Sequence, residues 1–108
     1  MDENINDWIS KKITSNDVVL FMKGTPETPQ CGFSSQVVQI LNYLGIEFSS
    51  VNVLEDESIR NGIKEYTNWP TIPQLYVKNE FIGGADIVRE MFEENDEIPL
   101  PTFTLTTN

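Results

Sequence analysis

The stretch VVLFMKGTPETPQCGFSSQVVQILNYLG, residues 18–45, decides the fold. Its first part, residues 18–23, is a continuous apolar run that ends in a charge, and its β-branched and aromatic content predicts a strand buried on both faces. A loop with one Gly and two Pro residues follows. From Phe33 onward, apolar residues recur at helical spacing until Gly45, a residue typical of a helix C-cap. The stretch therefore predicts a strand, a loop and a helix, with Cys31 where the loop meets the helix.

The flanking segments predict more of the same two kinds of element. Apolar spacing, capping residues and turn signals predict helices over residues 3–14, 56–66 and from Asp86, and strands over 48–53, 74–78 and 81–82, the last two joined by a turn at 79–80. A βαβ half followed by a ββα half predicts an α/β protein: a mixed four-stranded sheet flanked by helices on both faces. We expect one domain over residues 1–108, with a loosely held tail over residues 98–108.

Composition excludes several classes of function. The chain carries 17 Asp and Glu against 7 Lys and Arg, and a formal charge of −10 disfavours non-specific nucleic-acid binding. It has no His, which excludes Ser-His and Cys-His catalysis and His-ligated metal sites. Its single Cys excludes an internal disulfide and fits a reducing compartment. With an acidic N-terminal segment and no apolar run near the roughly 20 residues of a membrane helix, we expect a soluble, cytoplasmic protein without a membrane partner.

The candidate reactive residue is Cys31. A thiol at a helix N-terminus lies near the positive end of the helix dipole and near free N–H groups, both of which favour the thiolate. The competing interpretation is a small buried hydrophobic residue, but Cys31 stands at a loop–helix junction and not in an apolar stripe. Ser34 occupies the place that a second Cys takes in a C-x-x-C motif. A mixed disulfide on Cys31 therefore needs an external thiol to resolve it.

Cationic side chains are expected near this thiol. In a strand–loop–helix unit the end of the strand lies beside the start of the helix, so Lys23 is either a solvated lysine or a cation that stabilises a thiolate or an incoming carboxylate. Arg60 and Lys64 are four residues apart on a predicted helix, where two cations repel each other unless an anion lies between them. The competing interpretation pairs Arg60 with Asp56.

Two further segments carry candidate ligand groups. In Trp69-Pro-Thr-Ile-Pro73, a cis Ile72–Pro73 bond would present the Ile72 backbone to an extended peptide, whereas the simpler interpretation is a loop that ends a helix. Gly83-Gly-Ala-Asp86 opens the last predicted helix, whose free N–H groups bind anions, and Asp86 either caps that helix, binds a ligand amine, or does both. Thiol, cations, backbone and acid together describe a site for a small, doubly charged peptide thiol.

These residues make the chain resemble the CGFS-type monothiol glutaredoxins. The matching motifs keep the family's order and spacing over nearly the whole chain; they are Met22-Lys-Gly-Thr25, Pro29-Gln-Cys-Gly-Phe-Ser34, Trp69-Pro-Thr-Ile-Pro-Gln-Leu-Tyr76 and Ile82-Gly-Gly-Ala-Asp-Ile87. The resemblance implies a thioredoxin-like fold in which Pro73 is the family's cis-proline, and it implies that the peptide thiol is glutathione.

The resemblance also assigns roles to single residues. Lys23 and Arg60 would hold the glycine carboxylate of glutathione, and Lys64 would support them without contacting the ligand. Ile72 would pair through its backbone, and Ala85 and Asp86 would bind the γ-glutamyl end. Cys31 would be the redox-active and iron-ligating thiolate. The chain departs from the family in having Ala85 where many relatives have Cys, and in having Pro99 and Pro101 where relatives often continue the final helix.

The family is known mainly for carrying a labile [2Fe–2S] cluster. Such a cluster needs four ligands, usually thiolates, and each chain supplies one, so two Cys31 thiolates and two glutathiones would complete the set in a glutathione-bridged homodimer. The resemblance implies cluster storage and transfer, a role in iron homeostasis, and BolA-like and iron–sulfur assembly proteins as partners. Two alternatives stay open: a glutathione-dependent thiol–disulfide oxidoreductase acting through Cys31, of weak activity by the resemblance, and a redox-sensing interaction module.

Overall fold

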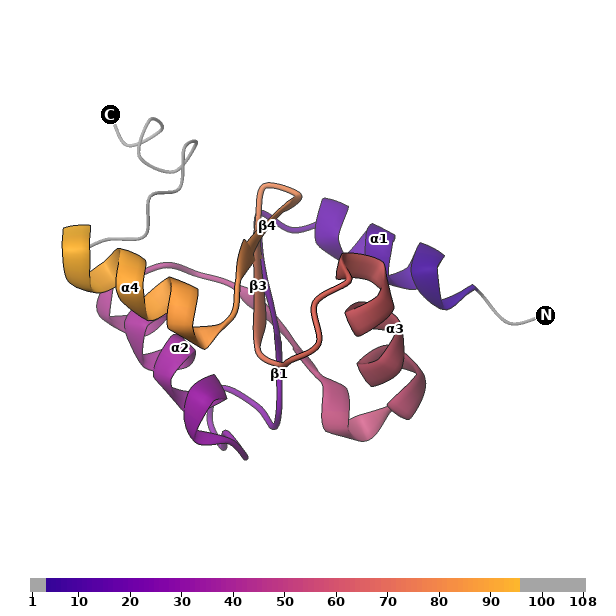
Figure 1. Cartoon of the computed structure of the whole chain (residues 1–108), viewed down its shortest axis with the longest axis horizontal. Helices are drawn as coiled ribbons and strands as arrows, with labels where there is room; N and C mark the ends of the chain where they lie inside the picture. Colours follow the sequence, from indigo (N-terminus) through magenta and orange to yellow (C-terminus); the bar gives the residue numbers. More distant parts are fainter. Residues whose placement is uncertain (1–3, 96–108) are drawn as a thin grey trace.

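A four-stranded sheet forms the middle layer of the protein, with two helices on each of its faces (Figure 1). The computed structural model describes residues 4–95. The elements are α1 (Ile5–Thr14), β1 (Val18–Met22), α2 (Gly32–Tyr43), β2 (Ser49–Asn52), the 3₁₀ helix η1 (Val53–Glu55), α3 (Glu57–Thr67), β3 (Gln74–Val77), β4 (Glu80–Gly83) and α4 (Ala85–Asn95). Helices α1 and α3 cover one face of the sheet, and α2 and α4 cover the other. The predicted mixed sheet between helices is confirmed.

The strand order is β2-β1-β3-β4. Strand β1 pairs parallel with β2 and antiparallel with β3, and β3 pairs antiparallel with β4. Phe21, near the end of β1, lies opposite Gln74 at the start of β3. The end of β1 and the start of β3 therefore share one edge of the sheet. The loop that follows β1, with Lys23 and Cys31, and the loop that precedes β3, with Ile72, therefore both lie at this edge.

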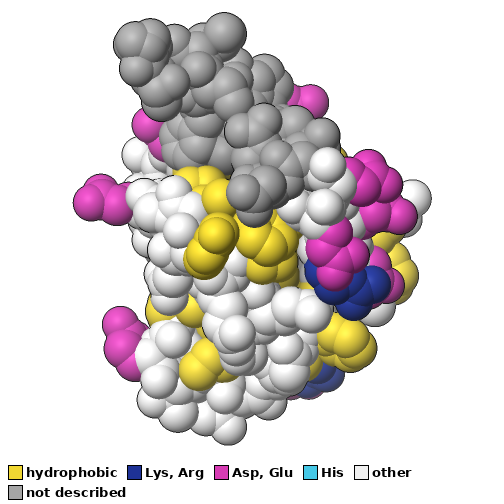
Figure 2. All heavy atoms as spheres, turned by 90° about the vertical axis from the view of Figure 1, so that its left-hand side faces the viewer, with side chains coloured by type: hydrophobic (Ala, Val, Ile, Leu, Met, Phe, Trp, Pro, Cys, Tyr) yellow, Lys and Arg dark blue, Asp and Glu magenta, His cyan; other side chains and the backbone are white. Residues whose placement is uncertain are grey.

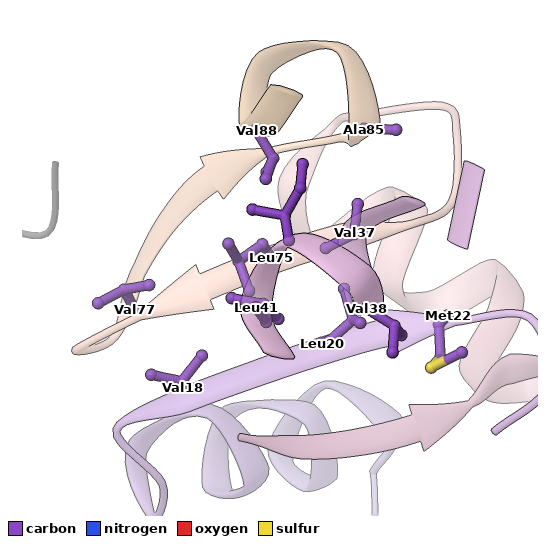
Figure 3. Packing of buried hydrophobic residues seen from close by; sticks show 11 residues of the cluster. Val18, Leu20, Met22, Val37, Val38, Leu41, Leu75, Val77, Ala85 and Val88 are labelled. Carbon is purple, nitrogen blue, oxygen red and sulfur yellow. The ribbon is translucent and has the colours of Figure 1, made fainter. Parts of the chain in front are cut away.

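Strand β1 is buried on both faces, as predicted. Val18, Leu20 and Met22 pack into a core with α2 and α4, which Figure 3 shows from close by. The alternate residues Val19 and Phe21 pack into a second core with α1 and α3. Because successive side chains of a strand point to opposite faces, one apolar run supplies the centre of both cores.

Most element ends follow the predicted capping chemistry. The Asp56 carboxylate accepts a hydrogen bond from the Ser58 N–H at 2.8 Å and caps α3. At the C-terminal end of α2, Gly45 follows the helix with a φ of +73°. A left-handed residue at this position is how many helices end, and glycine adopts it without a steric penalty.

Three features differ from those predicted, and several other element ends shift by one or two residues. The hairpin turn is at Lys78 and Asn79, both with positive φ, because a two-residue turn between twisted strands needs that conformation at both positions. Strand β4 consequently starts at Glu80. Asp86 stands in the first turn of α4, which begins at Ala85, and so it is not the residue before the helix that a cap requires. The third difference is η1, which the sequence patterns did not indicate.

The face made by α2 and α4 carries exposed hydrophobic side chains with acidic groups around its margin (Figure 2). Tyr43 of α2 is 72% exposed and meets Phe92 of α4 edge-on, with ring centroids 5.5 Å apart. Within residues 4–95, every helix is too short or too polar to span a bilayer. The predicted loose tail over residues 98–108 lies outside the described residues.

We predict that Leu41→Ala lowers the free energy of unfolding by about 3 kcal/mol, because Leu41 is fully buried between α2 and the sheet and its loss leaves a cavity. Leu54→Ala is the matched control: the same atoms are removed from a side chain that is 49% exposed, so the loss stays below about 1 kcal/mol. Urea denaturation measures both. Equal losses in the two variants would contradict the assignment of Leu41 to the core.

Candidate functional site

A pocket of about 450 Å³ opens at the sheet edge where β1 ends and β3 begins. It is lined by Lys23, Cys31, Phe33, Lys64, Trp69, Pro70, Thr71, Ile72, Pro73, Gly84, Ala85, Asp86 and Ile87. Five of the six candidate site residues are therefore brought together from three separate parts of the chain. The sixth, Arg60, does not line the pocket.

Cys31 stands at the N-cap position of α2 in an extended conformation, with φ −154° and ψ 135°. Its carbonyl accepts the first hydrogen bond of the helix, from the Ser35 N–H at 2.9 Å. Its side chain is partly exposed and completes no capping hydrogen bond of its own. The sulfur is therefore accessible at the helix N-terminus, where sequence reasoning placed it.

The surroundings of Cys31 favour the thiolate. Partial burial raises the pKa of the thiol, but the backbone N–H groups of Ser34 and Phe33, the positive charge of Lys23 and the Ser34 hydroxyl lower it by more. The net effect places the pKa of Cys31 below that of an ordinary cysteine. These are the groups expected at a helix N-terminus next to a strand-end lysine.

Ser34 has a structural role that the sequence left undecided. It is fully buried, and its hydroxyl accepts a hydrogen bond from the Lys23 N–H at 3.1 Å. This bond joins the end of β1 to the first turn of α2. Lys23 and Cys31 therefore come from two elements that are tied to each other directly beside the site.

The loop between Lys23 and Cys31 is closed by its own backbone. The Gln30 N–H donates to the Lys23 carbonyl at 2.9 Å. Thr25 and Thr28 exchange two backbone N–H to carbonyl hydrogen bonds across the loop. Gly24 has a φ of +90°, and a Cβ there would lie 2.6 Å from the Gln30 nitrogen, so the closure requires glycine.

Asn52 supports the same loop from the neighbouring strand, which sequence reasoning missed. Its side-chain oxygen accepts hydrogen bonds from the N–H groups of Gly24, at 2.9 Å, and Leu54, at 3.0 Å. An Asn at the end of a predicted strand is a signal for a local cap. Its link to Gly24, 28 residues away, follows only from the parallel pairing of β1 and β2.

The end of β1 and the start of α2, with Lys23 and Cys31, form the first wall of the pocket. The loop over residues 69–73 forms the second wall. The Ile72–Pro73 peptide bond is cis, as predicted. Within the described part of the chain, the backbone N–H and C=O of Ile72 make no hydrogen bond, although its side chain is buried. The Ile72 backbone is therefore free to pair with an extended ligand, as an unpaired strand edge is.

The cations are arranged differently from the expectation. Asn68 ends α3 in the left-handed conformation, and the Trp69 N–H returns to the Lys64 carbonyl at 3.1 Å. This turn puts Lys64 beside the loop that forms the pocket wall, whereas Arg60 lies one helical turn earlier. Arg60 makes no ion pair with residues 4–95, so the alternative pairing with Asp56 is wrong. The Asp56 carboxylate is instead engaged as the cap of α3.

The third wall is the N-terminus of α4. The Val88 N–H donates to the Gly84 carbonyl at 3.0 Å, which is the first bond of the helix. The N–H groups before it have no partner within a helix and point toward the N-terminal end. The Asp86 side chain is 80% exposed and lies 3.8 Å from the Arg89 guanidinium. Asp86 therefore presents a carboxylate at the pocket rim, next to a group of anion-binding N–H donors.

The assembled pocket combines a thiol of lowered pKa, two lysines, an unpaired stretch of backbone and a helix N-terminus with an acid beside it. These groups match a peptide thiol that carries carboxylates and an amine. Among the described residues, no group of three or more Cys, Asp or Glu side chains is placed to hold a metal ion. The sequence has one Cys and no His, so one chain supplies a single thiolate ligand, the Cys31 sulfur.

The glutaredoxin family model matches residues 18–82, which include β1, Cys31 and the loop before β3. A monothiol glutaredoxin of Synechocystis is 58% identical over 88 residues, which cover 82% of each chain. Monothiol glutaredoxin-S14 of Arabidopsis thaliana, named as chloroplastic, is 53% identical over 92 residues, covering 85% of this chain and 53% of the relative. The solution structure of reduced poplar apo GrxS14 superposes with a TM-score of 0.75 at 53% identity, covering 85% of this chain and 84% of that one.

These matches confirm the thioredoxin-like fold that the resemblance implied. The matched residues contain the strand, the thiol and the cis-proline loop that build the pocket. The similarity to monothiol members extends over more than four fifths of the chain. The chain therefore belongs to the glutaredoxin family, among its monothiol members.

Proposed function

We propose that this monothiol glutaredoxin binds glutathione in the pocket and, as a glutathione-bridged homodimer, holds a labile [2Fe–2S] cluster as cargo for storage and transfer in iron homeostasis. The observation that carries the proposal is the Cys31 thiol. It is accessible, its pKa is lowered, and it is the only Cys of a chain that has no His. The chain has a strong thiolate ligand but lacks the second thiol that a self-sufficient disulfide reductase needs.

Glutathione fits the pocket by the charge and polarity of each wall. Its glycine carboxylate meets Lys23 and Lys64, both of which line the pocket. The resemblance assigned this carboxylate to Lys23 and Arg60, and in our proposal Lys64 takes the nearer position while Arg60 adds positive charge from one turn away. The cysteinyl backbone of glutathione pairs with Ile72, and its thiol lies beside Cys31.

The γ-glutamyl end of glutathione carries both a carboxylate and an amine. At Ala85 and Asp86, the free N–H groups of the α4 N-terminus suit the carboxylate and the Asp86 carboxylate suits the amine. Ala85 contributes through its backbone, since its side chain is buried. The role does not depend on a Cys at this position.

The ligand chemistry supports a dimer. A [2Fe–2S] cluster takes four ligands, usually thiolates, and one chain supplies only the Cys31 sulfur. Two Cys31 thiolates and the thiolates of two bound glutathiones complete the set. Because glutathione is held without a covalent bond, the cargo is exchangeable. Transfer partners are then iron–sulfur assembly proteins and BolA-like proteins, as the resemblance implies.

A second function is favoured by the lowered pKa of Cys31 and its exposure. In glutathione-dependent thiol–disulfide exchange, the Cys31 thiolate attacks the glutathione sulfur of a glutathionylated protein. A Cys31–glutathione disulfide forms, and the protein thiolate leaves. A second glutathione thiolate then attacks this disulfide, which releases Cys31 and glutathione disulfide. We place this activity second because the resemblance implies that it is weak.

We also propose a cytoplasmic location, on the strength of the single free Cys, which fits a reducing compartment. The similarity to a relative named as chloroplastic makes the compartment a separate question from the chemistry. Localisation of the tagged full chain in its own cells answers it.

We predict that anaerobic reconstitution with iron, sulfide and glutathione produces a visible chromophore on a dimer, with one cluster per two chains. Cys31→Ser loses the chromophore, because the hydroxyl does not replace a thiolate ligand. Ser35→Ala is the matched control, since it removes a hydroxyl in the same helical turn without touching the thiol, and it keeps the chromophore. Absorbance and mass in solution are measured together.

A chromophore on a monomer, or one that forms equally well when another small thiol replaces glutathione, would contradict the bridged dimer. Failure of all reconstitutions, together with rapid release of glutathione from a glutathionylated peptide, would make the oxidoreductase the main function.

We predict that the pH midpoint for alkylation of Cys31 by iodoacetamide lies below that of a free cysteine, because the thiolate is the reacting form and its pKa is lowered. Lys23→Gln moves the midpoint to higher pH, since the Lys23 charge stabilises the thiolate. Lys64 lines the same pocket but is not among the groups that lower the pKa of Cys31. Lys64→Gln therefore leaves the midpoint unchanged. Equal shifts in both variants would show that only the net charge of the pocket matters.

We predict that Lys64→Gln weakens glutathione binding about threefold to fivefold, as expected for the loss of one partly exposed ion pair. Arg60→Gln, the same loss of charge one turn earlier on α3, has a smaller effect because Arg60 does not line the pocket. Isothermal titration at low and high salt measures both. A larger loss in Arg60→Gln would return the carboxylate to the position that the resemblance assigned.

A further inference from the structure

One buried polar side chain near the pocket has no part in the function described so far. Gln74, the first residue of β3, is fully buried. Its side-chain nitrogen donates hydrogen bonds to the carbonyls of Trp69 and Thr71, both at 3.1 Å. Its side-chain oxygen accepts from the hydroxyls of Thr67, at 3.1 Å, and Tyr76, at 3.2 Å. A carboxamide has two N–H donors, and both are used here.

The two ends of this amide serve different parts of the protein. The oxygen faces groups on regular elements, Thr67 at the end of α3 and Tyr76 on β3. The nitrogen faces the irregular loop that forms the second wall of the pocket, at two carbonyls on either side of Pro70. Gln74 therefore connects this loop to the sheet.

We infer that Gln74 is a positioning residue for the ligand: its two N–H bonds hold the 69–73 loop so that the Ile72 backbone stays presented to the pocket. The inference rests on the proposed binding of glutathione, because backbone pairing at Ile72 is the contact that it positions. Ile72 itself has no backbone hydrogen bond within the described residues. Its backbone orientation therefore depends on the bonds to Trp69 and Thr71 before it and on the strand after it.

The wall that carries the thiol is held by other groups. Ser34 ties β1 to α2, and Asn52 holds Gly24 in the loop before Cys31. None of the groups that lower the pKa of Cys31 bonds to Gln74. Loss of the Gln74 donors should therefore weaken ligand binding and leave the thiolate unchanged, whereas general loosening of the fold would change both.

The first measurement uses the unmodified chain. Hydrogen exchange of the Gln74 side-chain amide, followed by NMR, is expected to be much slower than that of Gln39, an exposed glutamine on α2. Equal exchange rates would overturn the inference, because the two N–H bonds to the loop would not persist in solution.

The second measurement uses Gln74→Glu, which keeps the shape and the accepting oxygen but removes the paired N–H donors. The readout is the equilibrium between reduced chain and glutathione disulfide: the Cys31 thiolate attacks one sulfur, a Cys31–glutathione disulfide forms, and glutathione thiolate leaves. We expect the equilibrium constant to fall about tenfold or more, because two buried carbonyls lose their donors and the loop is released. The NMR shifts of the Trp69 and Thr71 carbonyls, which lose their donors, should change, and the alkylation midpoint of Cys31 should not move.

Two controls separate positioning from stability. Tyr76→Phe removes a donor from the oxygen side of the amide and leaves the loop bonds intact. Val77→Ala opens a cavity in the same strand, in the core of the opposite face. Both lose stability, and both are expected to keep the disulfide equilibrium within about twofold of the unmodified chain. If Gln74→Glu does not fold, Gln74→Met replaces it, and if neither folds, side-chain exchange in the unmodified chain decides.

An equilibrium constant for Gln74→Glu no lower than that of Val77→Ala would overturn the inference, as would a Cys31 midpoint that shifts along with it. Failure of the unmodified chain to form the glutathione disulfide at all would instead contradict the proposed placement of the glutathione sulfur beside Cys31. In that case the carbonyl shifts of Trp69 and Thr71 in the Gln74 variants still test whether Gln74 holds the loop.

Discussion

The burial of β1 on both faces is the constraint on which the rest of the structure depends. One strand of five apolar residues supplies the centre of two cores, and each side chain of this size contributes about 1.5–3 kcal/mol when it leaves water. Helices are therefore needed on both faces, and neighbouring strands are needed on both edges. Because β1 is central and ends at Met22, the chain must leave the sheet there, and the reactive thiol follows within the next loop.

Three buried or half-buried polar groups turn this apolar framework into a site. Ser34 joins β1 to α2, Asn52 holds the loop before Cys31, and Gln74 holds the loop before β3. Each forms hydrogen bonds with backbone groups that would otherwise be unpaired. Leaving such groups unpaired in the protein interior costs free energy. The pocket is thus built from loops whose shape is fixed by side chains of the framework. Its lining residues are left free to meet a ligand.

The chemistry follows from what the pocket has and what the chain lacks. A thiolate at a helix N-terminus beside a lysine is suited both to metal ligation and to attack on a disulfide. With one Cys and no His in the sequence, either reaction requires a thiol from outside. In both proposed functions glutathione supplies this thiol. The proposed cluster-carrying and disulfide-exchanging roles would therefore share one pocket and differ in what the second thiol binds.

The sequence by itself determined the α/β class, the buried central strand and the helix that begins after Cys31, because each rests on local periodicity or capping. Proline chemistry made a cis bond at Pro73 one of two interpretations, and the family resemblance favoured it. The sequence also predicted that Lys23, Cys31, Arg60, Ile72, Ala85 and Asp86 lie at ends of elements that share one edge, which is correct for the pocket-lining residues among them and wrong for Arg60. Only the tertiary structure decided that Lys64 and not Arg60 lines the pocket, since that depends on how the left-handed turn at Asn68 brings α3 against the loop. The same holds for Asn52 and Gln74: their hydrogen-bond partners are set by strand pairing and by loop packing, which act across distances that no sequence pattern encodes.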